Sequence, residues 1–387
     1  MRLEPARGFP TAEFEARTRR SQNLMQESAL DGMLLTTEAE VRYFSGFHTL
    51  FWQSPTRPWF LFVPGEGKPV AVIPEIGAAL MRGTWIDDIR TWSAPNPDDD
   101  GISLLIDLLS GVGQGGRIGL LKGAETHLRM PVGDFERLTG ALSDLTFADA
   151  TQIVRRLRMT KSEAEIEKIA YICQIGSDCF ECVPEFAKTG NALCDVFRDF
   201  RIQALKLGAD DVPYLVGGAD QGGYSDVISP PSSKPLRKGD ILMMDTGAVW
   251  DGYFCDFDRN FAIGSADDEA RRAHDTLWRA TEAGIEAAKP GVTCRDLFEA
   301  MQNVIKTLDE SGGDVGRLGH GLGMQLTEWP SHTAQDETIL EEGMVLTLEP
   351  SLSYGNEKMM VHEENIVIRE SGTELLTRRA PLEIPVI

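Results

Sequence analysis

Aspartates placed at apolar, strand-like segments constrain the fold of this chain more than any other feature. Asp245 directly follows the apolar run Ile241–Met244, and Asp256 lies on the next such segment, after an Asp251–Gly252 turn. A carboxylate that is buried in a strand is unfavourable unless it is paired or bound to a cation. From these residues alone two interpretations stay open: solvated aspartates of a hairpin, or buried carboxylates that hold a cation.

The same pattern recurs further along the chain. Glu349 follows the apolar run Val345–Leu348, and Glu363 precedes the β-type run Ile366–Ile368. His320 lies in the glycine-rich stretch "GRLGHGLG", whose glycines let the backbone bend so that the imidazole can reach a cation. Four carboxylates and one imidazole are a donor set for two hard divalent ions, which together activate water and polarise a carbonyl group.

The order of these five residues resembles the creatinase–prolidase–methionine aminopeptidase family of pita-bread metallohydrolases. The matching segments are "MMDTGAVWDGYFCDFDRNF", "GHGLG", "LEPSL" and "HEENIVI", and the two aspartates are separated by 256 − 245 = 11 residues, as in that family. The segment "LDGMLLTTEAEVRYFSGF" is similar to the creatinase/prolidase N-terminal domain. The resemblance implies an α+β protein with an α/β creatinase-type N-terminal domain, residues 1–152, and a pita-bread catalytic domain, residues 153–387.

The resemblance also implies two divalent metal ions (Mn, Co, Zn or Fe) and a role for each of the five side chains. Asp245 would chelate one ion. Asp256 and Glu363 would bridge both ions. His320 and Glu349 would hold the other ion, and Glu349 would also accept the proton of the attacking water.

Two departures from the family's pattern leave the substrate open. Prolidases and aminopeptidases P carry two helper histidines, but here Ile228 and Thr327 stand at those positions. Asp258, close to the second aspartate, is expected to be solvated or to lie outside the ligand set. The expected activity is hydrolysis of the amide bond of a dipeptide or peptide-like small molecule. The alternative is a non-peptidase branch, a C–N hydrolase or osmolyte lyase. An inactive binding module is disfavoured, because such relatives usually lack the metal ligands.

Other residues are weaker candidates for substrate contact. The segment Phe47–Phe60 is rich in aromatic residues, which is typical of a core or a dimer interface. In creatinase-like dimers the matching region reaches the partner's site. The resemblance thus implies a homodimer in which Arg57 and Trp52 approach substrate, with Arg57 clamping a carboxylate. His332 is a further candidate, whereas His362 should face away by strand alternation, and a structural role is the simpler interpretation of both.

Composition excludes some partners and indicates a compartment. A formal net charge of −22 disfavours nucleic acid and anionic membrane as partners. No apolar run is long enough to span a bilayer, and the N-terminal residues lack the apolar core of a signal peptide. The six cysteines form no disulfide framework or paired zinc motif, so Cys179 and Cys182 are expected to be buried thiols. Together these features predict a cytoplasmic protein.

The periodicity of the chain supports two domains of different type. Helical and strand-like segments alternate over the first ~150 residues, which predicts an α/β unit. Downstream, strands come in runs, which predicts a mostly antiparallel sheet. The pattern Thr160-Lys-Ser-Glu163 predicts a capping box at the start of a long helix, and Thr293 with Asp296 predicts the start of another.

Overall fold

The structure is a computed structural model of the 387-residue chain. It describes residues 3–54, 57–309 and 316–387. The chain divides into two compact units, one spanning Ala6–Arg158 and the other formed by Met159–Ile387 together with the residues up to Pro5. Within the described ranges, every helix is too short or too polar to cross a bilayer.

The first unit contains a mixed six-stranded sheet in the order β4-β3-β2-β1-β5-β6. The β1–β2 and β2–β3 pairs are antiparallel and the remaining pairs are parallel, so the predicted alternation of helix and strand builds an α/β unit. The strands are β1 (Gly32–Leu35), β2 (Phe60–Pro64), β3 (Val70–Pro74), β4 (Asp88–Trp92), β5 (Arg117–Leu120) and β6 (Thr146–Asp149). The helices are α1 (Thr11–Glu27), α2 (Glu38–Ser45), η1 (Leu50–Gln53), η2 (Glu75–Gly77), α3 (Ala78–Met81), α4 (Ile102–Ser110), α5 (Val132–Ala141) and α6 (Thr151–Met159).

Helix α6 explains where the two units divide. The boundary expected from the sequence lies between residues 152 and 153, whereas the observed units divide after Arg158. The Tyr43 hydroxyl donates to the Leu157 carbonyl at 3.1 Å, and the Arg158 guanidinium forms a buried ion pair with Glu40. These contacts tie almost all of α6 to α2, so the helix packs as part of the first unit.

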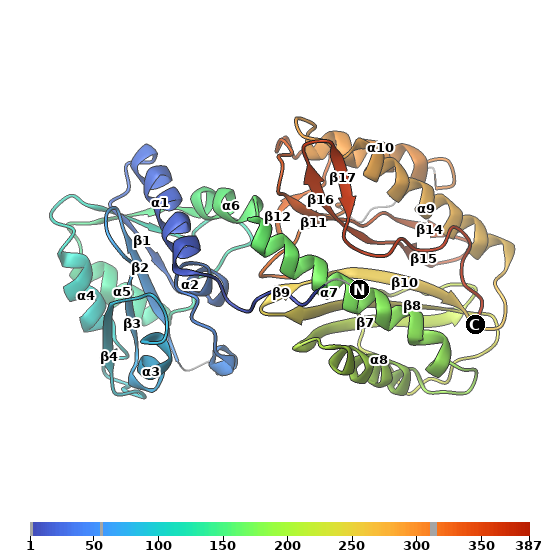
Figure 1. Ribbon diagram of the computed structural model, residues 1–387, viewed down its shortest axis with the longest axis horizontal. Coiled ribbons are helices and arrows are strands. Elements are labelled where there is room, and N and C mark those ends of the chain that lie inside the picture. Colours follow the sequence, from blue (N-terminus) through green and yellow to red (C-terminus); the bar gives the residue numbers. More distant parts are fainter. Residues whose placement is uncertain (1–2, 55–56, 310–315) are drawn as a thin grey trace. The chain divides into compact units, whose positions relative to one another are not determined.

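The second unit contains two antiparallel sheets, each covered by a pair of helices (Figure 1). Helices α7 and α8 pack on the sheet β10-β8-β7, in which β9 also pairs with β8, and α9 and α10 pack on the sheet β12-β11-β13-β16-β17. A separate hairpin joins β14 and β15. The helices are α7 (Glu163–Phe186), α8 (Leu193–Leu207), α9 (Asp268–Ala287) and α10 (Cys294–Ile305). The strands are β7 (Asp211–Gln221), β8 (Asp240–Trp250), β9 (Tyr253–Phe254), β10 (Phe257–Ala262), β11 (His320–Gly321), β12 (Glu328–Ser331), β13 (Val345–Leu348), β14 (Ser351–Tyr354), β15 (Lys358–Val361), β16 (Glu364–Arg369) and β17 (Gly372–Leu375).

One of the two predicted helix starts is correct and one is wrong. Thr293 caps α10 in a capping box with Asp296, as predicted. The long helix α7, however, is capped by Ser162 in a capping box with Glu165, and Thr160 lies outside it. Thr160 forms an isolated antiparallel β-bridge with Met344. Its backbone is therefore extended, and the helix cap lies two residues after the predicted one.

The hairpin between β8 and β10 positions the acidic side chains. Asp251 and Gly252 both have positive φ, 46° and 72°, as the central residues of a type I′ turn do. The resulting register places Asp245 directly opposite Asp258. In the other sheet, Leu348 lies opposite Glu364, which brings the ends of β13 and β16 together. Strands β10 and β16 are adjacent, so the acidic residues of both sheets meet there.

Candidate metal centre

Five predicted side chains converge where the two sheets of the second unit meet. Ligand atoms of Asp256, His320 and Glu363 all lie within 4.8 Å of one another. The His320 Nε2 atom is 3.5 Å from Asp256 Oδ2 and 3.9 Å from Glu349 Oε2. Asp245 is close enough to Glu349 and Asp256 for their charges to interact. Strand pairing has thus brought together residues that are far apart in the sequence.

The His320 imidazole is neutral and presents a free lone pair. Its Nδ1 atom lies 2.8 Å from the Gly321 carbonyl, which can only accept, so the proton is on Nδ1. The Nε2 lone pair therefore points toward the carboxylates. Burial, and then the positive charge of Arg317, lower the pKa of His320 to about 3, so the ring stays neutral near pH 7. A neutral imidazole with one nitrogen fixed by a carbonyl is the form that binds a metal.

Glycines let the His320 segment pass between two strands. Residues of β11 pair with β12 on one side and with β13 on the other. Gly319 has φ of +130°, and a Cβ atom there would collide with the Thr347 carbonyl and the His332 ring. A Cβ atom on Gly321 would collide with the Trp329 carbonyl. Gly319 and Gly321 are thus required by close backbone approach on both sides of the imidazole.

Simultaneous ionisation of all the carboxylates in the cluster is strongly unfavourable. Burial first, and then the neighbouring acidic groups, raise the pKa of Asp256 and of Glu363 well above the ordinary values. Burial and Glu349 raise the pKa of Asp245 to about 7, although the Tyr214 hydroxyl donates to it and opposes the shift. The pKa of Glu349 is also raised by burial, against the effect of Arg317. A nearby cation would reverse all of these shifts.

The donor set fits divalent cations. Asp245 Oδ1, Asp258 Oδ1 and Glu363 Oε1 are buried and have no hydrogen-bond partner within the described part of the chain. Buried carboxylate oxygens of this kind are normally paired or bound to a metal. Oxygen atoms from several carboxylates, together with one neutral imidazole, suit hard or borderline ions such as Mn²⁺, Co²⁺, Fe²⁺ or Zn²⁺.

Asn365 fixes the backbone of Asp256. Its Oδ1 atom accepts from the Asp256 amide at 3.0 Å, and its Nδ2 atom donates to the Asp256 carbonyl. Asn365 lies on β16, two residues after Glu363, so one amide side chain ties two acidic positions together. The sequence analysis missed this residue, and "HEEN" contains no local signal that would assign it.

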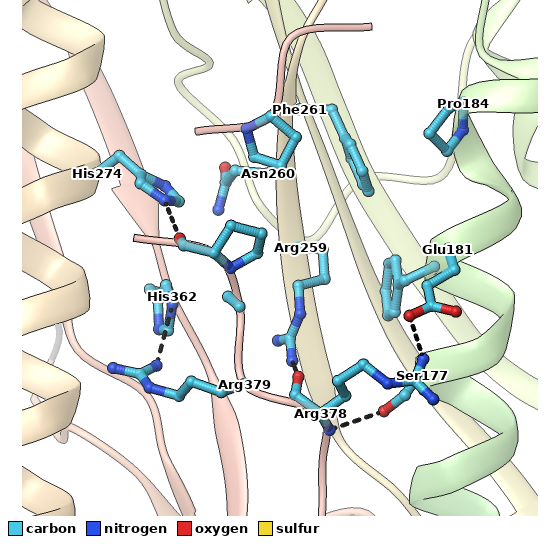
Figure 2. Close-up of a pocket in the computed structure, with 14 residues that line it drawn as sticks. Ser177, Glu181, Pro184, Arg259, Asn260, Phe261, His274, His362, Arg378 and Arg379 are labelled. Carbon is cyan, nitrogen blue, oxygen red and sulfur yellow. Dashed lines mark hydrogen bonds and ion pairs between the residues drawn. The ribbon is translucent and has the colours of Figure 1, made fainter. Parts of the chain in front are cut away.

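Arg259 fixes the same strands from the opposite face, where a pocket of about 240 Å³ lies beside α7 (Figure 2). Its Nη1 atom donates to the carbonyls of Asp258 (2.6 Å) and Glu363 (2.8 Å). Its Nη2 atom donates to the Glu364 carboxylate (2.9 Å) and the Arg378 carbonyl (2.5 Å). These interactions are all internal to the chain, so Arg259 holds the backbone of Asp258 and Glu363 in place.

Two further residues that the sequence analysis missed lie beside the cluster. Arg317 is half-buried, and its positive charge acts on Asp256, Glu349 and His320. Its place three residues before His320 is a signal that could have been used. Tyr214 lies on β7 opposite Gly247 and donates to Asp245; burial and the surrounding carboxylates raise its pKa. Nothing local to Tyr214 in the sequence marks this contact, which depends on strand pairing.

The residues predicted to contact substrate in the second unit have different surroundings. Ile228 is 74% exposed. Thr327 is exposed, and Arg317 donates to its hydroxyl at 3.5 Å. His332 is fully buried and donates from Nε2 to the Thr347 carbonyl at 3.1 Å. His362 points away from the cluster, as expected, and its Nδ1 atom contacts the Thr281 hydroxyl on α9 at 2.9 Å.

The remaining two predicted residues lie in the first unit. The Trp52 side chain is buried, 6.0 Å from the Trp59 ring, and the guanidinium of Arg129 lies over its ring. The Arg57 carbonyl accepts from Arg129. Part of the segment Phe47–Phe60, residues 55 and 56, lies outside the described residues. In the same segment Leu50 is 74% exposed and Phe51 is 37% exposed, so the segment offers an apolar surface.

Comparisons with known proteins agree with the geometry. Residues 167–370 match the model of metallopeptidase family M24, and residues 17–160 match the creatinase/prolidase N-terminal domain. The chain is 25% identical to the Xaa-Pro dipeptidase of Pyrococcus horikoshii over 92% of this chain and 94% of that protein. It is 26% identical to the probable dipeptidase PepE of Mycobacterium tuberculosis over 99% of both. The crystal structure of dipeptidase PepE from Mycobacterium ulcerans has a TM-score of 0.84 at 26% identity, covering 98% of this chain and 99% of that one. The predicted resemblance and fold class are confirmed.

Proposed function

Because the chain belongs to metallopeptidase family M24 and is a hydrolase of the metallopeptidase type, we propose that it cleaves the amide bond of a dipeptide or peptide-like small molecule at a two-metal site. The observation that carries this proposal is the cluster of buried carboxylate oxygens without partners beside a neutral imidazole. The relatives named Xaa-Pro dipeptidase and dipeptidase PepE support a dipeptide as the substrate.

In this proposal each side chain of the cluster has a defined role, and Glu349 has two. Asp245 would hold one ion, Asp256 and Glu363 would be shared by both ions, and His320 and Glu349 would hold the other. Two bound divalent ions would polarise the amide carbonyl and activate a water molecule. Glu349 keeps 31% of its side chain exposed, which suits a base that must meet water entering from solvent. It therefore accepts the proton of that water and passes it to the leaving amine.

Arg317 is the substrate-facing cation of the proposed site. It is half-buried beside Glu349 and Asp256, and Thr327 accepts from it. A guanidinium there can bind the free carboxylate of a dipeptide through two parallel hydrogen bonds. Thr327 thus serves to orient Arg317, in place of the proton transfer that a histidine at this position would provide.

The substrate is expected to differ from that of a plain prolidase. Ile228 and Thr327 cannot titrate near neutral pH, and general acid–base groups contribute about 10²–10⁴-fold to rate. The ligand set itself is complete, so activity on another amide should remain. The same two positions support the alternative, in which the chain acts on a small metabolite as a C–N hydrolase or osmolyte lyase.

The experiment that tests this function measures bound metal and hydrolysis together. Elemental analysis of the purified protein should give up to two Mn, Co, Zn or Fe ions per chain. With Mn²⁺ added, Ala-Pro and Gly-Pro should be cleaved weakly compared with other dipeptides or small N-acyl and cyclic amino acids. Xaa-Pro turnover with kcat of about 10 s⁻¹ or more would favour a plain prolidase. Absence of bound metal would reject the proposal.

A cytoplasmic homodimer is part of the same proposal. The six cysteines are free thiols, which suits a reducing compartment. The exposed Leu50 and Phe51 supply an apolar surface that a second copy would cover. In that dimer Arg57 would approach the partner's substrate and Ile228 would contribute to the chain's own pocket, whereas the buried Trp52 and His332 would act only by supporting these surfaces. Sedimentation of the active enzyme as a monomer would contradict this arrangement, and Leu50→Glu should weaken the dimer.

A further inference from the structure

Asp258 is a buried acidic side chain that the proposed set of five ligands does not use. Only 2% of the residue is exposed, so the expectation of a solvated carboxylate is wrong. It lies directly opposite Asp245 in the β8–β10 pair. Side chains directly opposite each other in an antiparallel pair have Cβ atoms about 4.5–5.5 Å apart. Asp258 and Asp245 are therefore immediate neighbours on one face of the sheet.

Strand alternation fixes the direction of the Asp258 side chain. Phe257, Arg259 and Phe261 face α7, since the rings of Phe257 and Phe261 lie 5.2 and 6.5 Å from Phe180 and the Arg259 guanidinium lies over the same ring. Side chains alternate along a strand, so Asp258 points to the opposite face. That face carries Asp245 and the metal-binding cluster.

The hydrogen bonds of Asp258 leave one oxygen available. Asn260 Nδ2 donates to Oδ2 at 3.2 Å, the Glu363 amide lies close enough to favour the charged carboxylate, and Oδ1 meets the geometry of a hydrogen bond with no group in the described residues. The nearest arginine on the same strand, Arg259, donates to the Asp258 carbonyl instead of the carboxylate. An unpartnered oxygen in a residue that is only 2% exposed, beside a second such oxygen on Asp245, is the environment in which a carboxylate binds a cation.

We propose that Asp258 Oδ1 is an additional ligand of the ion that Asp245 holds, so that five carboxylates and one imidazole form the metal centre. This inference rests on the proposed two-metal function. Two carboxylates on directly opposed residues can both reach one ion at about 2.0–2.6 Å. The extra anionic oxygen makes the ligand set of this ion harder, in the hard–soft sense, than a set with a single terminal aspartate. It therefore favours Mn²⁺ or Mg²⁺ over Zn²⁺ there.

The test compares the binding of Mn²⁺ and Zn²⁺ to the full-length chain and its variants. The variants are Asp258→Asn and, as a second replacement, Asp258→Ala. The matched control is Asp240→Asn on β8, because Asp240 is equally buried but both its oxygens have partners, Gln221 and the Arg237 amide. Metal is removed with a chelator, folding is checked by Tm, and each ion is titrated back in competition with a chromophoric chelator.

The expected result is selective. Both Asp258 variants should raise the Kd of one Mn²⁺ by at least about 10-fold, with a smaller change for Zn²⁺. The metal-free variants should fold with an equal or higher Tm, because a buried carboxyl group that repels the neighbouring carboxylates is gone, and the control should bind both ions as the wild type does. Equal changes for Mn²⁺ and Zn²⁺, which a merely structural role would give, or no change in either Kd, would overturn the inference alone. If the wild type binds neither ion, the inference fails together with the proposed function.

Discussion

Asn365→Ala should weaken metal binding even though Asn365 touches no metal. The amide and carbonyl of Asp256 are both satisfied by the Asn365 side chain, and residue 365 is fully buried. Alanine can reach neither group. Leaving a buried backbone donor or acceptor without a partner costs about 1–3 kcal/mol. Two such groups would lower the free energy of unfolding by about 2–6 kcal/mol, minus whatever an entering water restores.

The effect on the metal follows from the same contacts. Asp256 would no longer be held at a fixed depth beside Glu363, and loss of an orienting partner typically weakens metal affinity by about 10–100-fold. Asn365→Asp should be at least as harmful, because it keeps an acceptor for the Asp256 amide but turns a carboxylate toward the Asp256 carbonyl. Urea unfolding of the metal-free proteins gives the first quantity, and Mn²⁺ titration gives the second.

A matched control separates this effect from the general loss of an asparagine. Asn191 donates to the Phe186 carbonyl at 2.8 Å in an exposed position, where water can replace it. Asn191→Ala should change stability by less than about 1 kcal/mol and leave metal affinity unchanged. The reasoning would be refuted if Asn365→Ala bound Mn²⁺ within twofold of the wild type, because the backbone of Asp256 would then be held by something else.

Three other outcomes are expected. Asp256→Ala should abolish binding of both ions and turnover while the metal-free protein stays folded, since it loses one of several mutually repelling carboxylates; full activity would remove Asp256 from the site. Arg317→Ala should raise KM about 10–100-fold for dipeptides with a free carboxylate, from the loss of a charged hydrogen bond worth about 1.5–3 kcal/mol, and change KM little for amidated dipeptides, with Arg317→Lys intermediate. Equal losses on both substrates would assign Arg317 to the metals instead. For the metal-free protein, Tm should fall as pH rises from about 6.5 to 8. The unfolded state is then already ionised at Asp245, whereas the folded state releases that proton through its pKa of about 7. The lowered pKa of His320, about 3, destabilises the fold only below the ordinary histidine pKa of about 6.5, where the unfolded imidazole binds a proton; this contribution rises with pH but levels off above that value. Saturating Mn²⁺ should abolish the dependence of Tm on pH. A Tm that rises over this pH range would contradict the assignment of the raised pKa to Asp245.

Much of the candidate site could be predicted from the sequence because its evidence is local. An acidic residue next to an apolar run predicts a carboxylate on a buried strand, and Asp245, Asp256, Glu349 and Glu363 all carry that signal within a few residues of themselves. Gly319 and Gly321, which flank His320, carry another signal, since a Cβ atom at either position would collide with neighbouring backbone. The helix start at Thr293 was predictable for the same reason, because its capping partner Asp296 is one turn away.

Tertiary structure decided what depends on partners distant in the sequence. Thr160 and Glu163 have the spacing of a capping box, but Thr160 pairs with Met344 in a β-bridge, and Ser162 caps the helix instead. From the sequence Asp258 is expected to be solvated or to lie outside the ligand set, and only strand pairing shows that it lies opposite Asp245 and is buried. Asn365 acquires its role only because β16 lies beside β10. The residue type alone determines the chemistry of a side chain. Its burial and its neighbours depend on which strands pair, and strand pairing depends on the packing of the whole unit.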